Sequence, residues 1–314
     1  EEAYNAIDKD YFQDEKYSVI SLNLAEYYYN TAEYKKAIIF CKKFIKTTND
    51  LALVTSFYHR IGLCYRNIGM DEEDKTFHNK ALKNNIKLFG NKHINTANAY
   101  NSLGVSFLHS KDNHKSIEYF ERSIEIINEL YGEKHVDIIN FYQNLSIAWN
   151  NLYILGDAAS TFSSFDEDAS TFYKKSRFYD EKSLEIIKVN YGEKHTLISD
   201  YYLSLGQKEA EIGHYQKAIE SYELALPISV ACLGEFHIDV SVIYHNLGIS
   251  YRSLKMFDES IMSYNKSLEI KLENYGENHP DIAVSYFNIG KVYKSQIQED
   301  AIKNQNWDDN SNLY

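Results

Sequence analysis

Cysteine and proline are scarce in this chain of 314 residues, which has three cysteines and two prolines. The cysteines, Cys41, Cys64 and Cys232, lie far apart and form no CxxC pair. This usage predicts buried free thiols in a reducing compartment, and therefore a cytoplasmic protein, in place of a disulfide framework. The scarcity of proline is compatible with a largely helical chain.

Long apolar runs and excess positive charge are also missing. No apolar stretch approaches the roughly 20 residues that span a bilayer, and no charged and then apolar leader opens the chain. The 33 Lys and Arg residues face 45 Asp and Glu residues, which gives a net charge of −12. Because phosphate binding depends on a dense basic field, this balance argues against nucleic acids and anionic membranes as partners.

What the sequence does contain is a tandem repeat. Five glycines recur at steps of 42, 60, 42 and 42 residues, and each is followed three residues later by a histidine. The glycine and histidine pairs are Gly90 and His93, Gly132 and His135, Gly192 and His195, Gly234 and His237, and Gly276 and His279. A constant unit of this length with one insertion is typical of a solenoid, in which each unit covers the apolar face of the next. We therefore expect one elongated domain.

A second small residue lies 14 positions after each loop glycine, and the first two units have an equivalent small residue. It has a large apolar residue before it, and in most units a tyrosine four residues before it and an aromatic residue three after it. The small positions are Ala25, Gly62, Gly104, Ser146, Gly206, Gly248 and Gly290. These offsets fall on one stripe of a helix, and the small residue allows a neighbouring helix to approach closely. A second helix follows with Phe120, Tyr222 or Tyr264 at its middle.

The pattern of leucine, small residue and aromatic residue, followed by a small and an aromatic residue in a second helix, resembles the tetratricopeptide repeat. The 42-residue period and the segment from Gly276 to Asp281 are most similar to repeats of the kinesin light chain type. The resemblance implies an all-α, right-handed α-α superhelix of about six helix pairs plus a terminal helix. Its units are expected at 17–46, 52–88, 94–130, 136–189 with an insertion at 157–174, 196–230, 238–273 and, as a half unit, 280–296.

The five loop histidines are not expected to form a metal or catalytic site. Residues 42 apart in a solenoid are about 20 Å apart, because two stacked helices intervene, whereas metal ligands lie within about 2.6 Å of one ion. We expect these histidines to bind backbone groups where the next helix starts. The glycines leave no phosphate-binding loop, so we expect no cofactor, no metal and no catalytic residue. His59, His109 and His245 lie on the first helices and are candidates for ligand contact.

The resemblance also implies a peptide-binding groove, because in this family the residue two before the small position faces the concave side. An asparagine amide there can donate to and accept from a peptide backbone whatever its side chains. The matching positions are Asn23, Arg60, Ser102, Asn144, Ser204, Asn246 and Asn288. A solvated polar face is the alternative explanation. Five more residues complete the predicted site: His245, the cations Arg66, Arg252 and Lys294 four residues after a small position, and Lys291 one residue after a small position.

The cations could attract an acidic peptide, although Glu26, Asp200 and Glu211 are predicted to share their face. We therefore expect a groove of mixed sign, basic near its second unit and its C-terminal end. The insertion repeats Ala-Ser-Thr-Phe and is expected to form a flexible low-complexity loop. The alternative is a lid or internal pseudo-ligand whose three phenylalanines dock into the groove or a partner. Residues 1–16 are expected to cap or link the array, and residues 297–314 to form a polar tail.

The leading functional prediction is a non-enzymatic scaffold that binds an extended peptide segment of a protein partner in the concave groove. The alternative is a sensor or autoinhibitory module of a larger signalling protein, because the chain begins with Glu1 and its last unit lacks a clear second helix. Self-association through the terminal unit is a further prediction.

Overall fold

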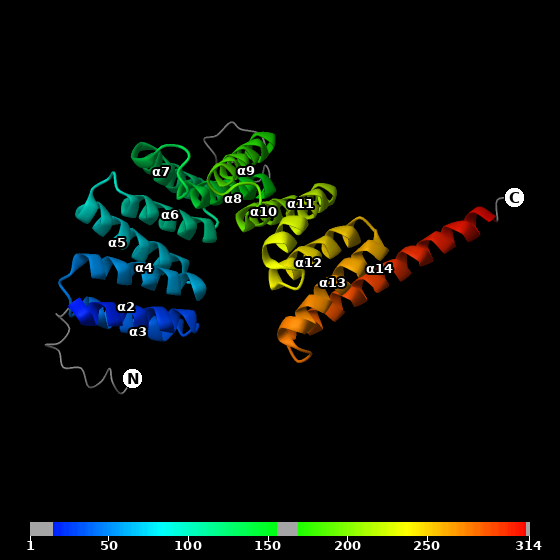
Figure 1. Ribbon diagram of the computed structural model, residues 1–314, viewed down its shortest axis with the longest axis horizontal. Helices are drawn as coiled ribbons and strands as arrows, with labels where there is room; N and C mark the ends of the chain where they lie inside the picture. Colours follow the sequence, from blue (N-terminus) through cyan, green and yellow to red (C-terminus); the bar gives the residue numbers. More distant parts are fainter. Residues whose placement is uncertain (1–14, 156–168, 312–314) are drawn as a thin grey trace. The chain divides into compact units, whose positions relative to one another are not determined.

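The computed structural model describes residues 15–155 and 169–311, and these residues form helices and no strand (Figure 1). The predicted all-α repeat fold is therefore confirmed. The helices are α2 (Glu15–Asn30), α3 (Tyr34–Ile45), α4 (Leu51–Asn67), α5 (Asp71–Phe89), α6 (Ile94–His109), α7 (Asn113–Tyr131), α8 (Ile138–Leu155), α9 (Ala169–Tyr191), α10 (Thr196–Glu211), α11 (Tyr215–Leu233), α12 (Ile238–Ser253), α13 (Phe257–Tyr275) and α14 (Pro280–Ser311).

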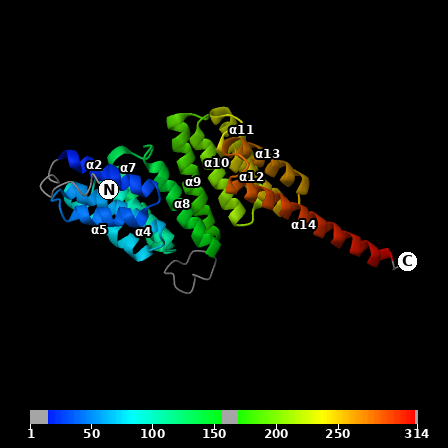
Figure 2. The same cartoon turned by 90° about the horizontal axis from the view of Figure 1, so that it is seen from below.

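The chain divides into two compact units, residues 1–186 and 187–314. The N-terminal unit holds α2 to α8 and most of α9, and the C-terminal unit holds α10 to α14. In each unit a helix packs on the helix that follows it, as α4 packs on α5 and α12 on α13 (Figures 1 and 2). First helices of successive pairs also touch, as α2 touches α4 and α10 touches α12. This is the packing expected of stacked helix pairs.

The loop histidines cap the helices that follow them, as the repeat predicts. In each of the five loops the histidine Nδ1 accepts a hydrogen bond from the backbone N–H two residues later, at 3.1 to 3.3 Å. Such a bond satisfies one of the N–H groups that a helix start leaves without a partner. In four loops the imidazole also packs against the aromatic residue four positions earlier, with ring centroids 4.3 to 4.7 Å apart, and three of these ring pairs are stacked.

In four helix pairs the small position of the first helix receives a ring from the second helix of the same pair, whereas Gly290 has nothing within 4 Å. A Cβ atom built on Gly104 would lie 2.6 Å from the ring of Phe120, and one on Gly206 would lie 2.4 Å from Tyr222. Both rings are almost fully buried. The expected close approach is therefore confirmed, and it explains why the repeat keeps a small residue at this position.

The ends of two elements differ from the expected boundaries. Helix α14 continues to Ser311, past the expected limit at 296. Residues 297–311 contain neither glycine nor proline, the residues that usually end a helix. Helix α9 begins at Ala169, so residues 169–174 of the expected insertion are helical. The rest of the insertion, residues 157–168, and the N-terminal segment up to residue 14 lie outside the described residues.

The three cysteines do not share one environment. Cys41 and Cys64 are buried as predicted, and burial raises the pKa of Cys41 to about 12 and that of Cys64 to about 11. Cys232 is exposed, so the prediction of three buried thiols is wrong for this residue. It lies in the last turn of α11, where its Sγ is 3.8 Å from the backbone oxygen of Lys194.

Candidate functional site

A cavity of about 600 Å³ opens in the N-terminal unit, between α2, α4, α5 and α6. Asn23, Arg60 and Ser102 all line it. These three residues occupy the position two before the small residue in three successive repeats, so the stacking brings them to one surface. The predicted convergence of this position therefore occurs within the N-terminal unit. The cavity is of the size that binds small ligands in other proteins.

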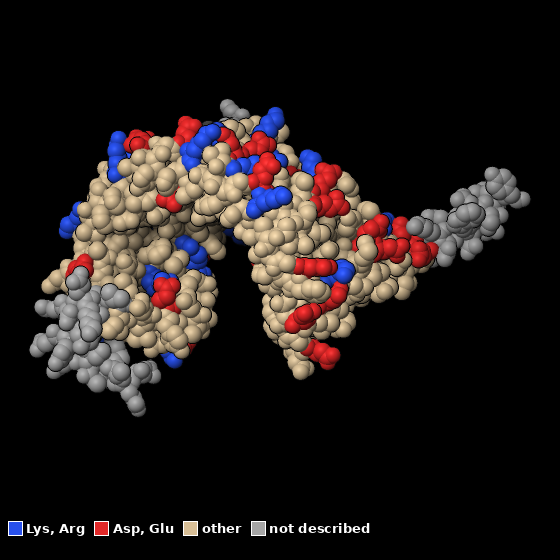
Figure 3. All heavy atoms as spheres, in the orientation of Figure 1, with Lys and Arg blue, Asp and Glu red and all other residues tan. Residues whose placement is uncertain are grey.

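Arg60 does not offer a free positive charge to this cavity. Its guanidinium forms an ion pair with Glu26 of α2 and lies 4.8 Å above the ring of Tyr29. Glu26 and Arg60 carry opposite charges, and both residues line the cavity. Figure 3 shows that this unit's hollowed face carries few charged side chains apart from one group in which basic and acidic side chains lie together. Both signs are present here as expected, but the expected basic character near the second unit is wrong, because Arg60 and Arg66 are each paired with a carboxylate.

Arg66 turns away from the predicted groove and into the layer between helices. Its guanidinium donates to Asp74 Oδ2 at 3.0 Å, to the backbone oxygen of Ser102 at 3.1 Å and to Ser106 Oγ at 3.0 Å. Its side chain is only 13% exposed, and that of Asp74 is fully buried. A buried carboxylate requires a paired cation, so Arg66 links α4 to α5 and α6. It is not placed to bind a peptide.

His78 of α5 completes this buried polar cluster. Its Nδ1 lies 2.5 Å from Asp74 Oδ1 and 3.2 Å from Ser106 Oγ. Burial alone would raise the pKa of Asp74, but the hydrogen bond and charge of His78, together with Arg66, hold it below its usual value. His78 covers Gly62 in the place that Phe120 has over its own glycine.

His59 lies beside this cluster and lines the same cavity. Its ring meets the ring of His78 edge to face, with centroids 5.1 Å apart. Burial, and then the nearby positive groups His78, Arg60 and Arg66, lower the pKa of His59 to about 3. The imidazole is therefore neutral at physiological pH. His59 was a predicted ligand contact, and the structure places it where such contact can occur.

Asn144 contacts another asparagine within the N-terminal unit. Its Nδ2 donates to Oδ1 of Asn101 at 3.0 Å, which joins α8 to α6. The donor side of the Asn144 amide is thus partly engaged, and its own oxygen keeps its capacity to accept.

His245 and Asn246 occupy the corresponding part of α12 in the C-terminal unit. Nδ1 of His245 and Nδ2 of Asn246 are buried and have no hydrogen-bond partner within residues 15–155 and 169–311. Burial, and then the charge of Lys271, lower the pKa of His245. Its ring packs edge-on against Tyr264, with centroids 5.4 Å apart. Arg252, about two turns further along α12, is half-buried.

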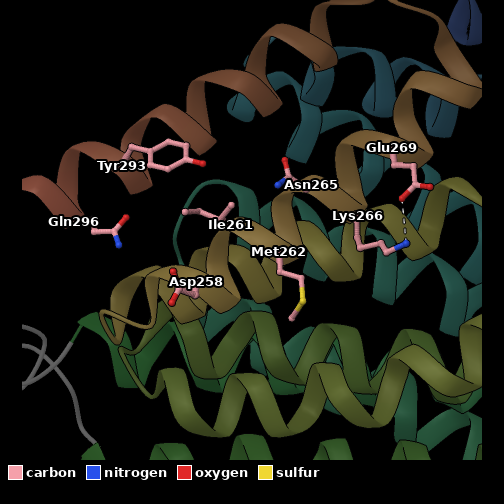
Figure 4. Close-up of a pocket in the computed structure, with 8 residues that line it drawn as sticks. All are labelled: Asp258, Ile261, Met262, Asn265, Lys266, Glu269, Tyr293 and Gln296. Carbon is pink, nitrogen blue, oxygen red and sulfur yellow. Dashed lines mark hydrogen bonds and ion pairs between the residues drawn. The ribbon is translucent and has the colours of Figure 1, made fainter.

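Helix α14 presents the remaining predicted residues. Asn288 is half-buried, whereas Lys291 and Lys294 are exposed, and the Lys291 ammonium lies 4.3 Å from the ring centroid of Phe287. A shallow depression of about 640 Å³ lies between α13 and α14, where Tyr293 and Gln296 come from α14 (Figure 4). Large apolar side chains of α14 are exposed, namely Val284, Tyr286, Phe287, Tyr293, Ile297 and Ile302.

Sequence reasoning did not single out Asp74 or His78. Asp74 lies in an acidic run at the start of α5, and such a run is typical of a solvent-exposed first turn of a helix. The signal that could have found the pair is repeat register, because His78 stands 16 residues after its glycine, where later repeats have Phe120, Tyr222 and Tyr264. A polar residue at a core position of one repeat marks that repeat as different.

The described residues contain no group of three or more His, Cys, Asp and Glu side chains arranged to hold a metal ion. Within the same residues, no helix combines the length and the apolar character needed to cross a membrane.

Stacked helix pairs with capped loops, and with a ring packed on the small residue in four of the pairs, define a helical-repeat protein. The tetratricopeptide repeat model matches residues 53–126 and 239–306. The matched residues are therefore tetratricopeptide repeats, and the predicted resemblance to that family is confirmed. No curated protein is similar to it at a significant level.

Three solved structures illustrate the shared fold. BtubC (BKLC) from P. vanneervenii is 16% identical with a TM-score of 0.58, and the match covers 79% of this chain and 92% of that one. A putative kinesin light chain with nearly identical TPR-like repeats from Podosopora anserina is 14% identical with a TM-score of 0.56, covering 73% and 100%. The apo quorum sensor NprR from B. thuringiensis is 12% identical with a TM-score of 0.58, covering 88% and 70%. At these identities the likeness concerns the fold alone.

Proposed function

We propose that this protein is a non-enzymatic interaction scaffold that holds an extended peptide segment of a protein partner against the first helices of its repeats. The observation that carries the proposal is the convergence of Asn23, Arg60 and Ser102 on one cavity. Polar side chains that recur in register along a solenoid can bind successive units of a peptide backbone, which itself repeats.

The unpartnered amide of Asn246 supports the same proposal in the C-terminal unit. A buried amide N–H without a partner is unfavourable by about 1 to 3 kcal/mol, and a peptide carbonyl would satisfy it. We propose Asn23, Arg60, Asn144, His245, Asn246, Arg252, Asn288, Lys291 and Lys294 as contact residues. Arg66 would act indirectly, by fixing α4 on α6. The proposal includes a cytoplasmic location, and neither a cofactor, a nucleic acid nor a membrane takes part.

The test is selection of peptides from a display library, followed by titration calorimetry with the wild-type protein and two variants. Asn246→Ala should weaken the selected peptides about tenfold, since it removes one buried hydrogen bond. Asn79→Ala is the matched control, because Asn79 is exposed on the second helix α5. Equal loss in both variants, or a library that yields no binder, would contradict the proposal.

A second candidate is a sensor or autoinhibitory module of a larger signalling protein. The observation that favours it is the row of exposed apolar side chains on α14, where Phe287 is 63% and Ile297 is 69% exposed. Exposed apolar side chains in such a row are typical of a surface that another domain or chain covers. Sequencing the complete reading frame and measuring whether a selected peptide changes the output of an attached effector tests this candidate. Dilution-dependent light scattering would detect self-association through the same surface.

A further inference from the structure

Gly290 of α14 has no ring packed on it, unlike four equivalent glycines. In four helix pairs a ring of the second helix lies so close to the first-helix glycine that an added Cβ atom would meet it at 2.4 to 2.9 Å. A Cβ atom on Gly290 would meet nothing within 4 Å. Helix α14 thus keeps the small residue that accepts a ring, and the described residues contain no second helix after α14 to supply one.

Gly290 lies at the middle of an exposed face of α14, which we call the α14 stripe. Its members stand 7, 4 and 3 residues before the glycine and 3 and 7 residues after it, and such offsets share one side of a helix. They are Ala283, Tyr286, Phe287, Gly290, Tyr293 and Ile297, and all are exposed. In α12 the first five equivalent positions, from Ser241 to Tyr251, are buried or half-buried where α13 packs on that helix.

The α14 stripe continues into the depression between α13 and α14. Tyr293 belongs to both surfaces, and Met262 of α13 lines the depression with 64% of its surface exposed (Figure 4). Two earlier second helices have the exposed residues Glu118 and Glu220 at the position of Met262. Methionine is enriched where proteins bind one another, and exposed apolar patches mark such surfaces. The surface therefore offers both α13 and α14 to one further helix.

The earlier pairs show what kind of helix such a surface accepts. In three of them the ring of the second helix has a serine or alanine four residues before it and three residues after it, and all these small residues are buried. The three rings are Phe120, Tyr222 and Tyr264. In α13 both small residues also bind α12, because Ser260 Oγ donates to the backbone oxygen of Gly248 at 2.7 Å and Ser267 Oγ to that of Ser241 at 2.8 Å.

Neither the segment that follows Gly290 nor a second copy of the described residues offers a helix of this kind. Helix α12 ends at Ser253, five residues after its glycine, and the chain then turns back into α13. Helix α14 continues to Ser311, 21 residues after Gly290, which is about 30 Å along the helix axis. In a second copy, the four rings of this kind already lie on the glycines of their own pairs. The arrangement therefore favours a helix of a different protein.

We propose that the α14 stripe binds an amphipathic helix of a partner protein, whose aromatic ring packs on Gly290 as Tyr264 packs on Gly248. This helix carries serine or alanine four residues before its ring and three residues after it, and its small residues lie against α14. The proposal goes beyond the peptide groove, because it concerns a second surface and a partner segment that is helical and not extended.

The experiment uses a synthetic peptide with the sequence of α13, Phe257–Tyr275, as the probe. A fluorescent label on the peptide reports binding to the full chain through fluorescence anisotropy. We expect saturable binding, and an affinity at least about tenfold lower for a Tyr264→Ala peptide, since a core aromatic side chain is lost. A Met262→Ala peptide is the matched control. It should bind within about twofold of the original, because Met262 is exposed in its own helix pair.

Two variants of the protein locate the site. Gly290→Leu fills the space that the ring would take and should weaken the probe at least about tenfold, although the new side chain has room in the free protein. Gln298→Leu adds the same side chain at an exposed position of α14 outside the stripe and should leave the affinity unchanged. Far-ultraviolet circular dichroism checks that both variants fold.

Three results would overturn the inference: no saturable binding of the probe, equal binding of the Tyr264→Ala peptide, or undiminished binding to Gly290→Leu. The last result also detects exchange of the probe for the chain's own α13, which does not depend on Gly290. Sedimentation that shows a dimer of the free protein, lost in Gly290→Leu, would assign the α14 stripe to a second copy and refute the partner helix.

The outcome is separate from that of the peptide scaffold. Library peptides that bind and are weakened by Asn246→Ala, with no binding of the α13 probe, leave the scaffold standing and refute the helix site. Binding of the α13 probe that depends on Gly290, with no peptide binder in the library, supports the helix site and refutes the scaffold.

Discussion

Acidification should destabilise this protein through His59, and the structure gives the size of the effect. The pKa of His59 is lowered to about 3 by burial and by nearby positive groups, against 6.5 for the ordinary side chain. Below pH 6.5 the unfolded chain binds a proton at this residue and the folded chain does not. The free energy of unfolding therefore falls as the pH falls from 6.5 towards 3.

Between pH 7.5 and 5.5 this single residue should lower the free energy of unfolding by about 1.4 kcal/mol, since one pH unit below the unfolded pKa corresponds to about 1.36 kcal/mol. His59→Gln and His59→Phe remove the titrating group, and the second keeps an aromatic ring against His78. Both variants should lose this part of the pH dependence, while all other titrating groups contribute equally to the wild type and the variants.

The assay is urea unfolding followed by far-ultraviolet circular dichroism at pH 7.5, 6.5 and 5.5. An NMR titration of the His59 ring in the folded protein provides a direct check. Unfolding curves that shift in parallel for the wild type and both variants, or a His59 ring that titrates near pH 6.5, would refute the reasoning.

Three further predictions concern stability and are checked by chemical unfolding. Gly104→Ala should destabilise the protein by about 1 to 3 kcal/mol, because the new methyl group would clash with a buried ring. Gly290→Ala has free space around the new methyl group and should be neutral or stabilising. A loss of stability at Gly290 as large as at Gly104 would argue against the steric explanation. Lys111→Gly should stabilise the protein by roughly 1 kcal/mol, because Lys111 has a φ of 62°, which glycine adopts without strain. Gly69→Ala, at a φ of 74°, should destabilise it by a similar amount. A stability change of the same sign in both variants would be inconsistent with backbone strain. His93→Ala should cost about 0.5 to 2 kcal/mol through loss of its cap and its ring stacking, and no change would show that the cap contributes nothing.

The repeat allowed the short-range contacts of this fold to be predicted from the sequence. Register alone identified the loop histidines as helix caps and the glycines such as Gly104 as contact points for a neighbouring helix, and the structure confirms both. These features depend on side chains that are close in sequence or exactly one helix apart, so periodicity is enough to locate them.

The polar cluster of the N-terminal unit could not be predicted in this way. Arg66 appeared as an inner-face cation because its position on α4 is set by helix geometry, but its direction is set by Asp74 of α5. Asp74 in turn is buried only because α5 packs on α6. Such an arrangement depends on three helices at once, and single-helix periodicity carries no information about it.

The length of α14 was also beyond local rules. Its last part is polar and has no periodic apolar stripe, and this composition fits a helix as well as an irregular tail. The absence of glycine and proline after residue 296 is the one local signal that favours the helix.

The central claim, that the first helices of the repeats form the binding face, is tested most directly by photo-crosslinking. A library-selected peptide carrying a benzophenone is irradiated with the full chain, and the linked residues are identified by mass spectrometry. The account predicts links to α2, α4, α6 and α12, around Asn23, Ser102 and Asn246. Links confined to the exposed sides of the second helices α5, α7 and α13 would contradict it.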